Sequence, residues 1–394
     1  MVVHRSFWTE KIKSLWQERS IIWLSGIRRS GKTTLHQFFP QAEYFDCERP
    51  SDRLVLRDPE TFLNQMKGKT LFIDEIHRLD NPSELLKLAG DYYPETLIIA
   101  TGSSTLGASR KFKDTLTGRK RTLWLTPMIS QDLADFGTTD LKLRLSRGGL
   151  PSFFLKAAYP KADYQEWIDS FWAKDIQTLF SIERRDAFIK FLEMLLANSG
   201  ELFEATRFAA ACEVSRPTIS TYLAILTETF VVHTIRPFSR NKSAEIVSAP
   251  KVYGFDTGFV SFQKGWALPR EDDFGHLWEH YVLNELMAHN QLRDIYYWRD
   301  KAGHEIDFVI HTTSTQSLIA IECKWSVSNP IPTRNCLAFL KRYPNAIFYV
   351  VSANIRRSFD QKIEDRLIRY VSLESLITAI WDKKQSLSQR CSLG

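Results

Sequence analysis

The sequence has few features of a secreted or membrane-spanning protein. It contains only five cysteines, at positions 47, 212, 323, 336 and 391, and no C-x-x-C pair. This scattered set argues against a disulfide framework or a zinc knuckle and favours a reducing compartment, so we expect a cytoplasmic protein. Apolar runs such as Thr96–Ala100 are too short to cross a bilayer, and the first residues lack the apolar core of a signal peptide. We therefore expect no membrane partner.

Charge of one sign is also scarce. The chain has 52 Lys and Arg against 46 Asp and Glu, a net charge of +6. Four segments, residues 1–135, 136–197, 198–262 and 263–394, carry 20 − 17 = +3, 9 − 8 = +1, 6 − 6 = 0 and 17 − 15 = +2. No segment is a basic domain, so any nucleic-acid surface has to be local. The 44% of hydrophobic residues excludes a disordered chain, and 394 residues predict two to four domains.

A glycine-rich loop near the N-terminus has the pattern of a phosphate-binding site. Residues 21–25 are a short apolar run that predicts a strand, and residues 26–34 read GIRRSGKTT, which fits G-x-x-x-x-G-K-[ST] at every fixed position. A predicted helix follows over Thr33–Phe39. Glycines let backbone N–H groups approach phosphates closely, and the lysine places a positive charge on the β- and γ-phosphates. The residues expected to bind ATP are Gly26, Arg29, Ser30, Gly31, Lys32, Thr33 and Thr34.

Two carboxylates follow the next apolar strand, Thr70–Asp74. We expect Asp74, with the hydroxyl of Thr33, to hold the Mg²⁺ that accompanies ATP. The neighbouring Glu75 is expected to orient and deprotonate the attacking water. A carboxylate at this position indicates hydrolysis with turnover, which distinguishes the site from a slow nucleotide switch.

A third apolar strand, Thr96–Thr101, ends in polar residues. Ser103 at this edge is expected to contact the γ-phosphate, although a simple serine-rich turn has the same composition. Ala42–Asp46 and Thr122–Thr126 complete five strands alternating with helices, which predicts a parallel α/β sheet.

A basic cluster precedes the last of these strands. Six of the twelve residues from Arg110 to Arg121 are Lys or Arg. One of the arginines, of which Arg119 is the leading candidate, is expected to complete the ATP site of a neighbouring subunit. Contact with a phosphate backbone and a merely solvated face remain alternatives.

These motifs resemble a family of prokaryotic AAA+-like ATPases. The resemblance rests on GIRRSGKTTL, LFIDEIHRLDNP, ATGSS, the TGR before the fifth strand, and GGLP at residues 148–151. It extends over nearly the whole chain, and the C-terminal region of such proteins is often described only as a domain of unknown function. It implies a P-loop ATPase core over residues 1–135, a helical lid over 136–197, and a homo-oligomer, a hexamer being the usual form.

Residues 198–262 predict a winged helix. Glu201–Ala211 has helical spacing, and the segment from Cys212 to Leu223 looks like the turn and second helix of a helix-turn-helix. Phe230–Pro237 and Lys251–Phe255 predict the two strands of a wing. Arg216, Arg240 and Lys242 are the expected DNA contacts. A packing module with the same fold and no DNA contact is an equal alternative, because the segment has no net charge.

Residues 263–394 carry a carboxylate–lysine pattern that resembles the PD-(D/E)xK nuclease superfamily. Asp307 on one strand is expected opposite Glu322 on the next, and Glu322 and Lys324 share a strand face. The two carboxylates are expected to hold a divalent ion beside the lysine. The resemblance adds Glu279, from the preceding helix, as a further ligand. Cleavage of DNA and a retained fold used only for docking both fit this pattern.

The sequence therefore predicts an α/β protein: an AAA+-like parallel sheet with a helical lid, then a winged helix, then a restriction-endonuclease-like domain. The leading hypothesis is a Mg²⁺-dependent, oligomeric ATPase that translocates on or remodels duplex DNA, including branched or forked DNA. An ATP-gated nuclease in defence or repair is one alternative. An ATP-driven signalling or assembly switch is another.

Overall fold

The apolar run before the glycine-rich loop forms strand β1 (Ile21–Gly26), every residue of which is buried. The computed structural model describes residues 2–102, 116–177, 180, 182–239, 248–291, 294–312, 317–327 and 334–380. The chain divides into two units, Met1–Lys190 with Pro217–Val232, and Phe191–Arg216 with His233–Gly394.

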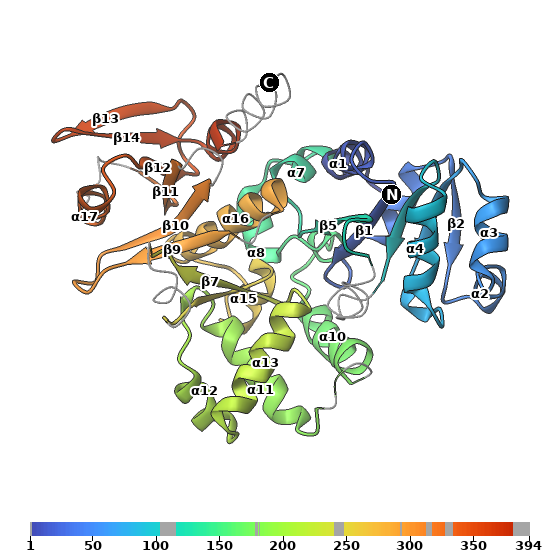
Figure 1. Ribbon diagram of the computed structural model, residues 1–394. Helices are drawn as coiled ribbons and strands as arrows, with labels where there is room; N and C mark the ends of the chain where they lie inside the picture. Colours follow the sequence, from blue (N-terminus) through green and yellow to red (C-terminus); the bar gives the residue numbers. More distant parts are fainter. Residues whose placement is uncertain are drawn as a thin grey trace. The chain divides into compact units, whose positions relative to one another are not determined.

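The first unit is built on a parallel five-stranded sheet with the order β2-β3-β4-β1-β5. Its other strands are β2 (Ala42–Asp46), β3 (Thr70–Asp74), β4 (Leu97–Thr101) and β5 (Lys120–Leu125), drawn in blue to teal in Figure 1. All five predicted strands and their parallel arrangement are confirmed. Because β1 is an internal strand with β4 on one side and β5 on the other, the loop after it emerges between these neighbours, where ligands bind in such sheets.

Helices surround this sheet. The predicted helix after the glycine-rich loop is the 3₁₀ helix η1 (Thr33–Phe38), which is short because Phe39 precedes a proline and so disfavours helical backbone. Before the segment predicted as a lid come α1 (Ser6–Trp16), α2 (Pro50–Val55), α3 (Pro59–Gln65), η2 (Ile76–Arg78), α4 (Pro82–Tyr92) and α7 (Ser130–Asp135). Within that segment lie α8 (Leu141–Arg147), α9 (Pro151–Phe154), α10 (Lys161–Phe171), the π-helix η3 (Trp172–Ile176) and α11 (Arg185–Ala197). Helix α13 (Arg216–Glu228) follows later in the chain.

The second unit contains a nine-stranded mixed sheet with the order β13-β14-β12-β11-β10-β9-β7-β8-β6. The strands are β6 (Glu201–Leu202), β7 (Val232–Pro237), β8 (Lys251–Gly254), β9 (Ile295–Arg299), β10 (Glu305–Thr312), β11 (Ser317–Lys324), β12 (Ile347–Ser352), β13 (Phe359–Ile363) and β14 (Arg366–Val371). The strands predicted as a wing, β7 and β8, therefore lie in the same sheet as the strands of the C-terminal segment, because β7 pairs in parallel with β9.

The described helices of this unit include α12 (Ala205–Cys212), α15 (Thr257–Gln263), α16 (Asp273–Asn290) and α17 (Arg334–Arg342), and residues 373–380 are also helical. Helix α16 contacts β11, and Trp278 on it donates a hydrogen bond to the carbonyl of Val351, 3.2 Å away. It is buried almost all around, which is the pattern of a helix inside a fold and not on its surface. The helix therefore brings its polar residues, Glu279 among them, to the sheet.

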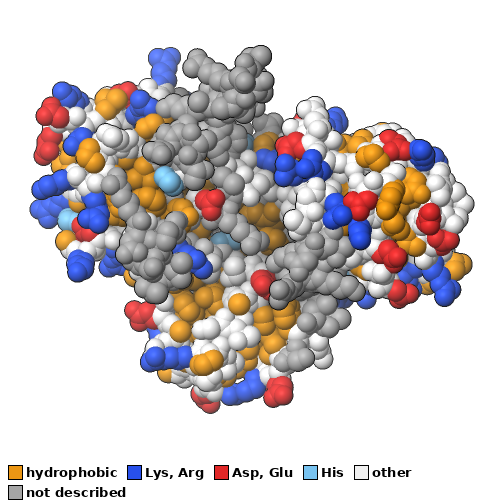
Figure 2. Space-filling model, in the orientation of Figure 1, with side chains coloured by type: hydrophobic (Ala, Val, Ile, Leu, Met, Phe, Trp, Pro, Cys, Tyr) orange, Lys and Arg blue, Asp and Glu red, His pale blue; other side chains and the backbone are white. Residues whose placement is uncertain are grey.

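Three observations concern the features that are scarce in the sequence. The cysteines at 47, 212, 323 and 336 are buried free thiols. In the part of the chain that the structure describes, no helix is both long and apolar enough to cross a bilayer. On the face shown in Figure 2, basic and acidic side chains are interspersed, as the small segment charges lead one to expect.

Candidate functional site

The two glycines of the phosphate-binding motif have backbone conformations that other residues rarely adopt. Gly26 has φ = 152° and Gly31 has φ = 97°. A Cβ atom on Gly26 would lie 2.7 Å from the carbonyl oxygen of Leu125 on the adjacent strand. The close approach of β1 and β5 thus requires glycine at position 26, and the loop that follows turns back toward the sheet edge.

Lys32 lies within this loop and is held by its backbone. Its Nζ donates to the carbonyl oxygens of Gly26 (2.9 Å) and Ile27 (3.1 Å). Burial lowers the pKa of Lys32, and the nearby carboxylates of Glu75 and Asp175 oppose that shift. The lysine, the loop and these carboxylates therefore share one site.

Asp74 and Glu75 leave the end of β3 and are linked by Thr101 at the end of β4. The Thr101 hydroxyl donates to Oδ1 of Asp74, and its oxygen accepts the backbone N–H of Glu75 at 3.1 Å. Tyr44 donates to the other oxygen of Asp74 at 3.2 Å. Thr101 belongs to the polar strand end recognised in the sequence, but its link to both carboxylates could not be predicted from that pattern. Ser103, the residue expected to contact the γ-phosphate, lies outside the described residues.

Glu75 has an unusual backbone and a well-defined charge. It has φ = 51°, in the left-handed region, and so aims its side chain away from the direction of the strand. His77 Nδ1 lies 3.1 Å from Oε2 of Glu75. Burial alone would raise the pKa of Glu75, but the hydrogen bond and charge of His77, with the charge of Lys32, outweigh it and keep the pKa below its ordinary value. Glu75 is therefore a carboxylate at neutral pH.

These groups line a cleft of about 690 Å³. Residues from the segment predicted as a lid also line it, among them Lys174 and Asp175. Arg28 Nε pairs with Asp175 at 2.9 Å, and Arg29 pairs with Glu166 at 2.5 Å. The lid segment thus contributes carboxylates that contact the glycine-rich loop directly. Sequence reasoning missed both pairs, because nothing in residues 161–176 marks these acids as different from solvated ones.

A buried arginine, Arg5, donates a hydrogen bond to the backbone of the glycine-rich loop. Arg5, which is 3% exposed, forms two hydrogen bonds with Asp132 at 2.9 and 2.6 Å and donates to the carbonyl of Ser30 at 2.9 Å. Asp132 also accepts the backbone N–H of Ile129 and so caps α7. This pair joins the N-terminal residues to the phosphate-binding loop and was not foreseen from the sequence.

The remaining predicted ATP ligands lie on the same loop. Ser30 is fully buried, and within the described part of the chain its hydroxyl has no hydrogen-bond partner. Thr33 and Thr34 open η1 with exposed side chains and line the cleft. A hydroxyl at the start of η1 and the Asp74 carboxylate at the end of β3 are oxygen donors of the kind that Mg²⁺ prefers, so these residues fit the ion.

Arg119 lies elsewhere in its own subunit. It precedes β5 and forms two hydrogen bonds with Asp91 of α4, at 2.6 and 3.0 Å. In the register of β1 and β5, Lys120 is level with Ile21 and Leu125 is level with Gly26, so Arg119 is at the sheet edge opposite the glycine-rich loop. Arg121 pairs with Glu18. Arg110 lies outside the described residues.

The expected DNA contacts are only partly described. Arg216 is the first residue of α13, and both helices predicted from the helix-turn-helix pattern, α12 and α13, are present. Glu213, in the turn that follows α12, has φ = 53°. Arg240 and Lys242 lie outside the described residues.

The second site predicted from the sequence lies at the junction of β10 and β11. These strands are antiparallel, with Phe308 opposite Ile321, so that the next step of the register brings Asp307 to the level of Glu322. Oδ2 of Asp307 accepts the backbone N–H of Cys323 at 2.7 Å, and Lys324 pairs with Glu322 at 2.7 Å. The predicted juxtaposition of Asp307, Glu322 and Lys324 is therefore present.

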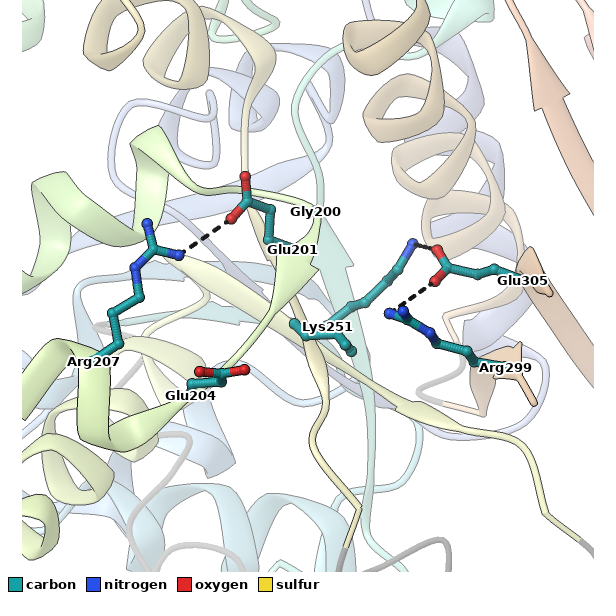
Figure 3. Close-up of a pocket in the computed structure, with 8 residues that line it drawn as sticks. Gly200, Glu201, Glu204, Arg207, Lys251, Arg299 and Glu305 are labelled. Carbon is teal, nitrogen blue, oxygen red and sulfur yellow. Dashed lines mark ion pairs between the residues drawn. The ribbon is translucent and has the colours of Figure 1, made fainter. Parts of the chain in front are cut away.

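Lys251, which sequence reasoning overlooked, enters this cluster from β8. Its Nζ lies 2.5 Å from Oε1 of Glu305 and 3.6 Å from Oε1 of Glu279, and its side chain is 7% exposed. Figure 3 shows it directed at Glu305, which Arg299 approaches from the other side at 3.6 Å. Tyr253, two residues along the same strand, donates to Glu279 at 2.6 Å. A lysine that begins a wing strand gives no signal of this role in the sequence.

The carboxylates of this cluster influence one another. Burial and the charge of Glu279 raise the pKa of Asp307 to about 7. Burial and the charge of Asp307 raise the pKa of Glu322 to about 8. Over the described ranges, no group of three or more His, Cys, Asp or Glu side chains is arranged to hold a metal ion.

Three family models match successive parts of the chain. Residues 18–133 match a model described as an AAA domain. Residues 138–269 and 274–374 match two models, each described as a domain of unknown function. The AAA match supports an AAA-like ATPase assignment for the N-terminal part, in agreement with its motifs. The two later matches leave the winged-helix and nuclease-like interpretations as proposals.

Relatives and solved structures add little about function. Uncharacterized proteins of Mycobacterium tuberculosis and Mycobacterium bovis are each 28% identical over 340 residues, which is 81% of this chain and 76% of each relative. A Walker-type ATPase of Pyrococcus abyssi is 14% identical, with a TM-score of 0.41 over 67% of this chain and 96% of that chain. A signal transduction ATPase with numerous domains from Pyrococcus horikoshii is 13% identical, with a TM-score of 0.28 over 71% of this chain and 46% of that chain. Both TM-scores are below 0.5 and carry no functional argument.

Proposed function

We propose that this protein hydrolyses ATP with Mg²⁺ in the cleft between the glycine-rich loop and the ends of β3 and β4. The observation that carries the proposal is the bridge by Thr101, which fixes a buried aspartate and an ionised glutamate side by side in the neighbourhood of Lys32. A site for binding alone would not need a second, ionised carboxylate at this position.

Each residue then has a defined role. Lys32 and the backbone N–H groups of residues 29–34 bind the phosphates. Asp74 and Thr33 would hold Mg²⁺, which supplies charge neutralisation on the phosphates when it is bound. Glu75 accepts a proton from the attacking water, because its low pKa keeps it deprotonated. Thr101 positions both carboxylates, and Ser103 remains a candidate contact to the γ-phosphate.

We extend the proposal to an oligomer, a hexamer being the favoured form, in which Arg119 reaches the ATP site of the next subunit. Its position at the sheet edge opposite its own glycine-rich loop supports action on a neighbour, and its partner Asp91 is exchangeable because the pair is at the surface. A mixture of Arg119→Ala and Lys32→Ala chains should regain hydrolysis if sites are shared. An Arg121→Ala chain is the matched control and should hydrolyse ATP without any mixing. A mixture of Arg119→Ala and Lys32→Ala chains that stays inactive removes support for shared sites.

The proposed target of this ATPase is duplex DNA, including branched or forked DNA. Support comes from the helix-turn-helix pattern with Arg216 at the start of α13, and from the nuclease-like arrangement of Asp307, Glu322 and Lys324 on adjacent strands. Arg240 and Lys242 are the further proposed contacts. The charges involved are local, so binding should weaken steeply with salt only if several subunits contribute.

One experiment tests both parts. ATP hydrolysis by the wild type and by Glu75→Gln is measured with no DNA and with linear, forked and four-way DNA, and the DNA is examined on a gel. We expect hydrolysis that branched DNA stimulates, no cutting, and loss of hydrolysis in the variant. If no DNA changes the rate of hydrolysis, the proposed ATPase activity stands and the proposed action on DNA is wrong. Slow turnover without any DNA response would favour an assembly switch.

A further inference from the structure

Every carboxylate of the C-terminal cluster already has a partner in the chain. Glu305 is paired with Lys251, Glu279 accepts a hydrogen bond from Tyr253, and Glu322 is paired with Lys324. Asp307 accepts the backbone N–H of Cys323. At least one oxygen of each carboxylate is thus turned toward an internal donor, while among the described residues Oε2 of Glu322 is buried without a hydrogen-bond partner.

Lys251 is the most buried cation of this group. Its side chain is 7% exposed, against 37% for Lys324 and 44% for Arg299. The Nζ of Lys251 lies 2.5 Å from a carboxylate oxygen of Glu305 and 3.6 Å from one of Glu279. A buried ammonium is stable only when carboxylates compensate it, and here these two do.

The carboxylate cluster is accessible to ions from solvent at Lys251 and Glu305. A pocket of about 340 Å³ reaches Lys251 and Glu305, and Arg299, Arg207, Glu201 and Glu204 also line it (Figure 3). A hydrated ion could enter such a space. To reach the carboxylate of Glu305 it would have to displace the cations of Lys251 and Arg299 that pair with it.

We infer that the ammonium of Lys251 is the resident cation of the C-terminal carboxylate cluster and takes the place of a divalent metal ion. The inference builds on the nuclease-like part of the proposed function and narrows it. The residues present fit an internal monocation and do not fit a bound divalent ion. On the proposed function the domain then contacts DNA without cutting it, and Lys324 remains hydrogen-bonded to Glu322.

The consequence for chemistry is direct. Metal-dependent cleavage of a phosphodiester requires an ion that activates water and neutralises the scissile phosphate. A lysine ammonium, held by Glu305 and Glu279, supplies one positive charge and no open coordination position. DNA bound to this domain should accordingly remain intact in Mg²⁺ or Mn²⁺.

The test measures Mn²⁺ binding to the full chain in the absence of nucleotide. Calorimetry gives the heat of binding, and electron paramagnetic resonance gives the concentration of free Mn²⁺. Wild type, Lys251→Met, and Lys251→Met combined with Asp307→Asn are compared up to about 1 mM Mn²⁺, the range of weak oxygen-ligand sites. We expect Lys251→Met to gain one Mn²⁺ per chain relative to wild type, and Asp307→Asn to remove the gain. Lys362→Met, at an exposed lysine paired with Asp365, is the matched control and should gain nothing.

Two results would overturn the inference. One is a Mn²⁺ site in the wild type that the single variant Asp307→Asn abolishes, a measurement that does not depend on how Lys251→Met folds. The other is a folded Lys251→Met chain, as judged by circular dichroism, that gains no Mn²⁺. ATP hydrolysis is measured on the same preparations. If hydrolysis fails, the ATPase proposal is wrong, but the comparison of Mn²⁺ binding between variants is unaffected.

Discussion

The two carboxylate sites of this chain differ in how their charge is balanced. At the N-terminal site, Asp74 and Glu75 receive hydrogen bonds from Thr101 and His77, and Lys32 is held by backbone carbonyls. At the C-terminal site, lysines pair with the carboxylates themselves. At the first site Lys32 and Glu75 line the cleft, and Asp74 is held by Thr101 and Tyr44. At the second site the lysines balance the charge of the carboxylates. Similar residue types thus serve two proposed ends, hydrolysis at one site and internal charge balance at the other.

The largest expected effect is on the rate of ATP hydrolysis when Glu75 of the N-terminal site is substituted. Glu75→Gln should lower kcat for ATP hydrolysis by about 10²–10⁴-fold, the usual contribution of a general base, and leave nucleotide binding largely intact. Steady-state hydrolysis and binding of a fluorescent ATP analogue measure the two quantities. Glu60→Gln, on the exposed surface of α3, is the control. A Glu75→Gln enzyme with nearly wild-type turnover would mean that Glu75 is not the base.

The next effect concerns the free energy of unfolding, and a buried cation from each unit, Arg5 or Lys251, can be substituted to measure it. Arg5→Ala removes the cation paired with Asp132, and Lys251→Ala removes the buried ammonium paired with Glu305 and Glu279. Each change should cost about 3–5 kcal/mol in the free energy of unfolding, because it removes one partner of a buried ion pair. Urea unfolding followed by tryptophan fluorescence is the measurement. Lys362→Ala, at an exposed pair, should cost less than about 1 kcal/mol. Equal losses in all three would remove the special status of the buried pairs.

The sequence allowed much of the first unit to be predicted. The glycine-rich loop and the Asp-Glu strand end have short-range patterns, because the chemistry of phosphate binding constrains neighbouring residues. The same holds for Asp307, Glu322 and Lys324, because their spacing along two adjacent strands is enough to predict that they lie together. The helix after the loop is a 3₁₀ helix, and the proline at position 40 limits how far it extends.

The partners of these motifs could not be predicted, because they come from distant positions. Arg5 reaches Asp132 across 127 residues, and Arg28 reaches Asp175 across 147. Lys251 meets Glu305 only because β8 and β10 belong to one sheet, in which β7 and β9 lie between them. Pairing of this kind depends on the order of strands and on how the lid segment packs, and neither leaves a periodic signal in the sequence.

A smaller effect appears as a dependence of stability on pH in the second unit. Burial lowers the pKa of His276 to about 2 and of His280 to about 4. The unfolded chain takes up protons below about pH 6.5 that the folded chain does not, so stability is lost as the pH falls from there toward 4. Each histidine should contribute about 1 kcal/mol per pH unit in this window.

Melting temperatures at pH 7.5 and 5.5 measure this effect. The difference between the two should be smaller for a His276→Gln, His280→Gln double variant than for the wild type. His36→Gln, in the first unit, should leave the difference unchanged. A double variant that loses as much stability as the wild type would assign the acid sensitivity to other groups.

The smallest expected effect is on the affinity of the N-terminal site for ATP, because a carboxylate of the chain, Asp175, lies in that site. Asp175 pairs with Arg28 at 2.9 Å and lies near Lys32, in the cleft where the phosphates of ATP would bind. Asp175→Asn removes a negative charge that opposes the phosphates and frees Arg28. Because the pair is partly exposed, the gain is limited to about 1 kcal/mol, so the Kd for ATP should fall about two- to five-fold.

Glu166→Gln is the matched control for this prediction. It weakens the pair with Arg29, but Glu166 is 65% exposed, so its charge is better screened and the change in Kd should be smaller. Titration with ATP under non-hydrolysing conditions, in the Glu75→Gln background, measures both variants. Weaker binding by Asp175→Asn would show that Asp175 shapes the loop for ATP and does not compete with its phosphates. In that case the N-terminal site, like the C-terminal one, would depend on an internal ion pair for its structure.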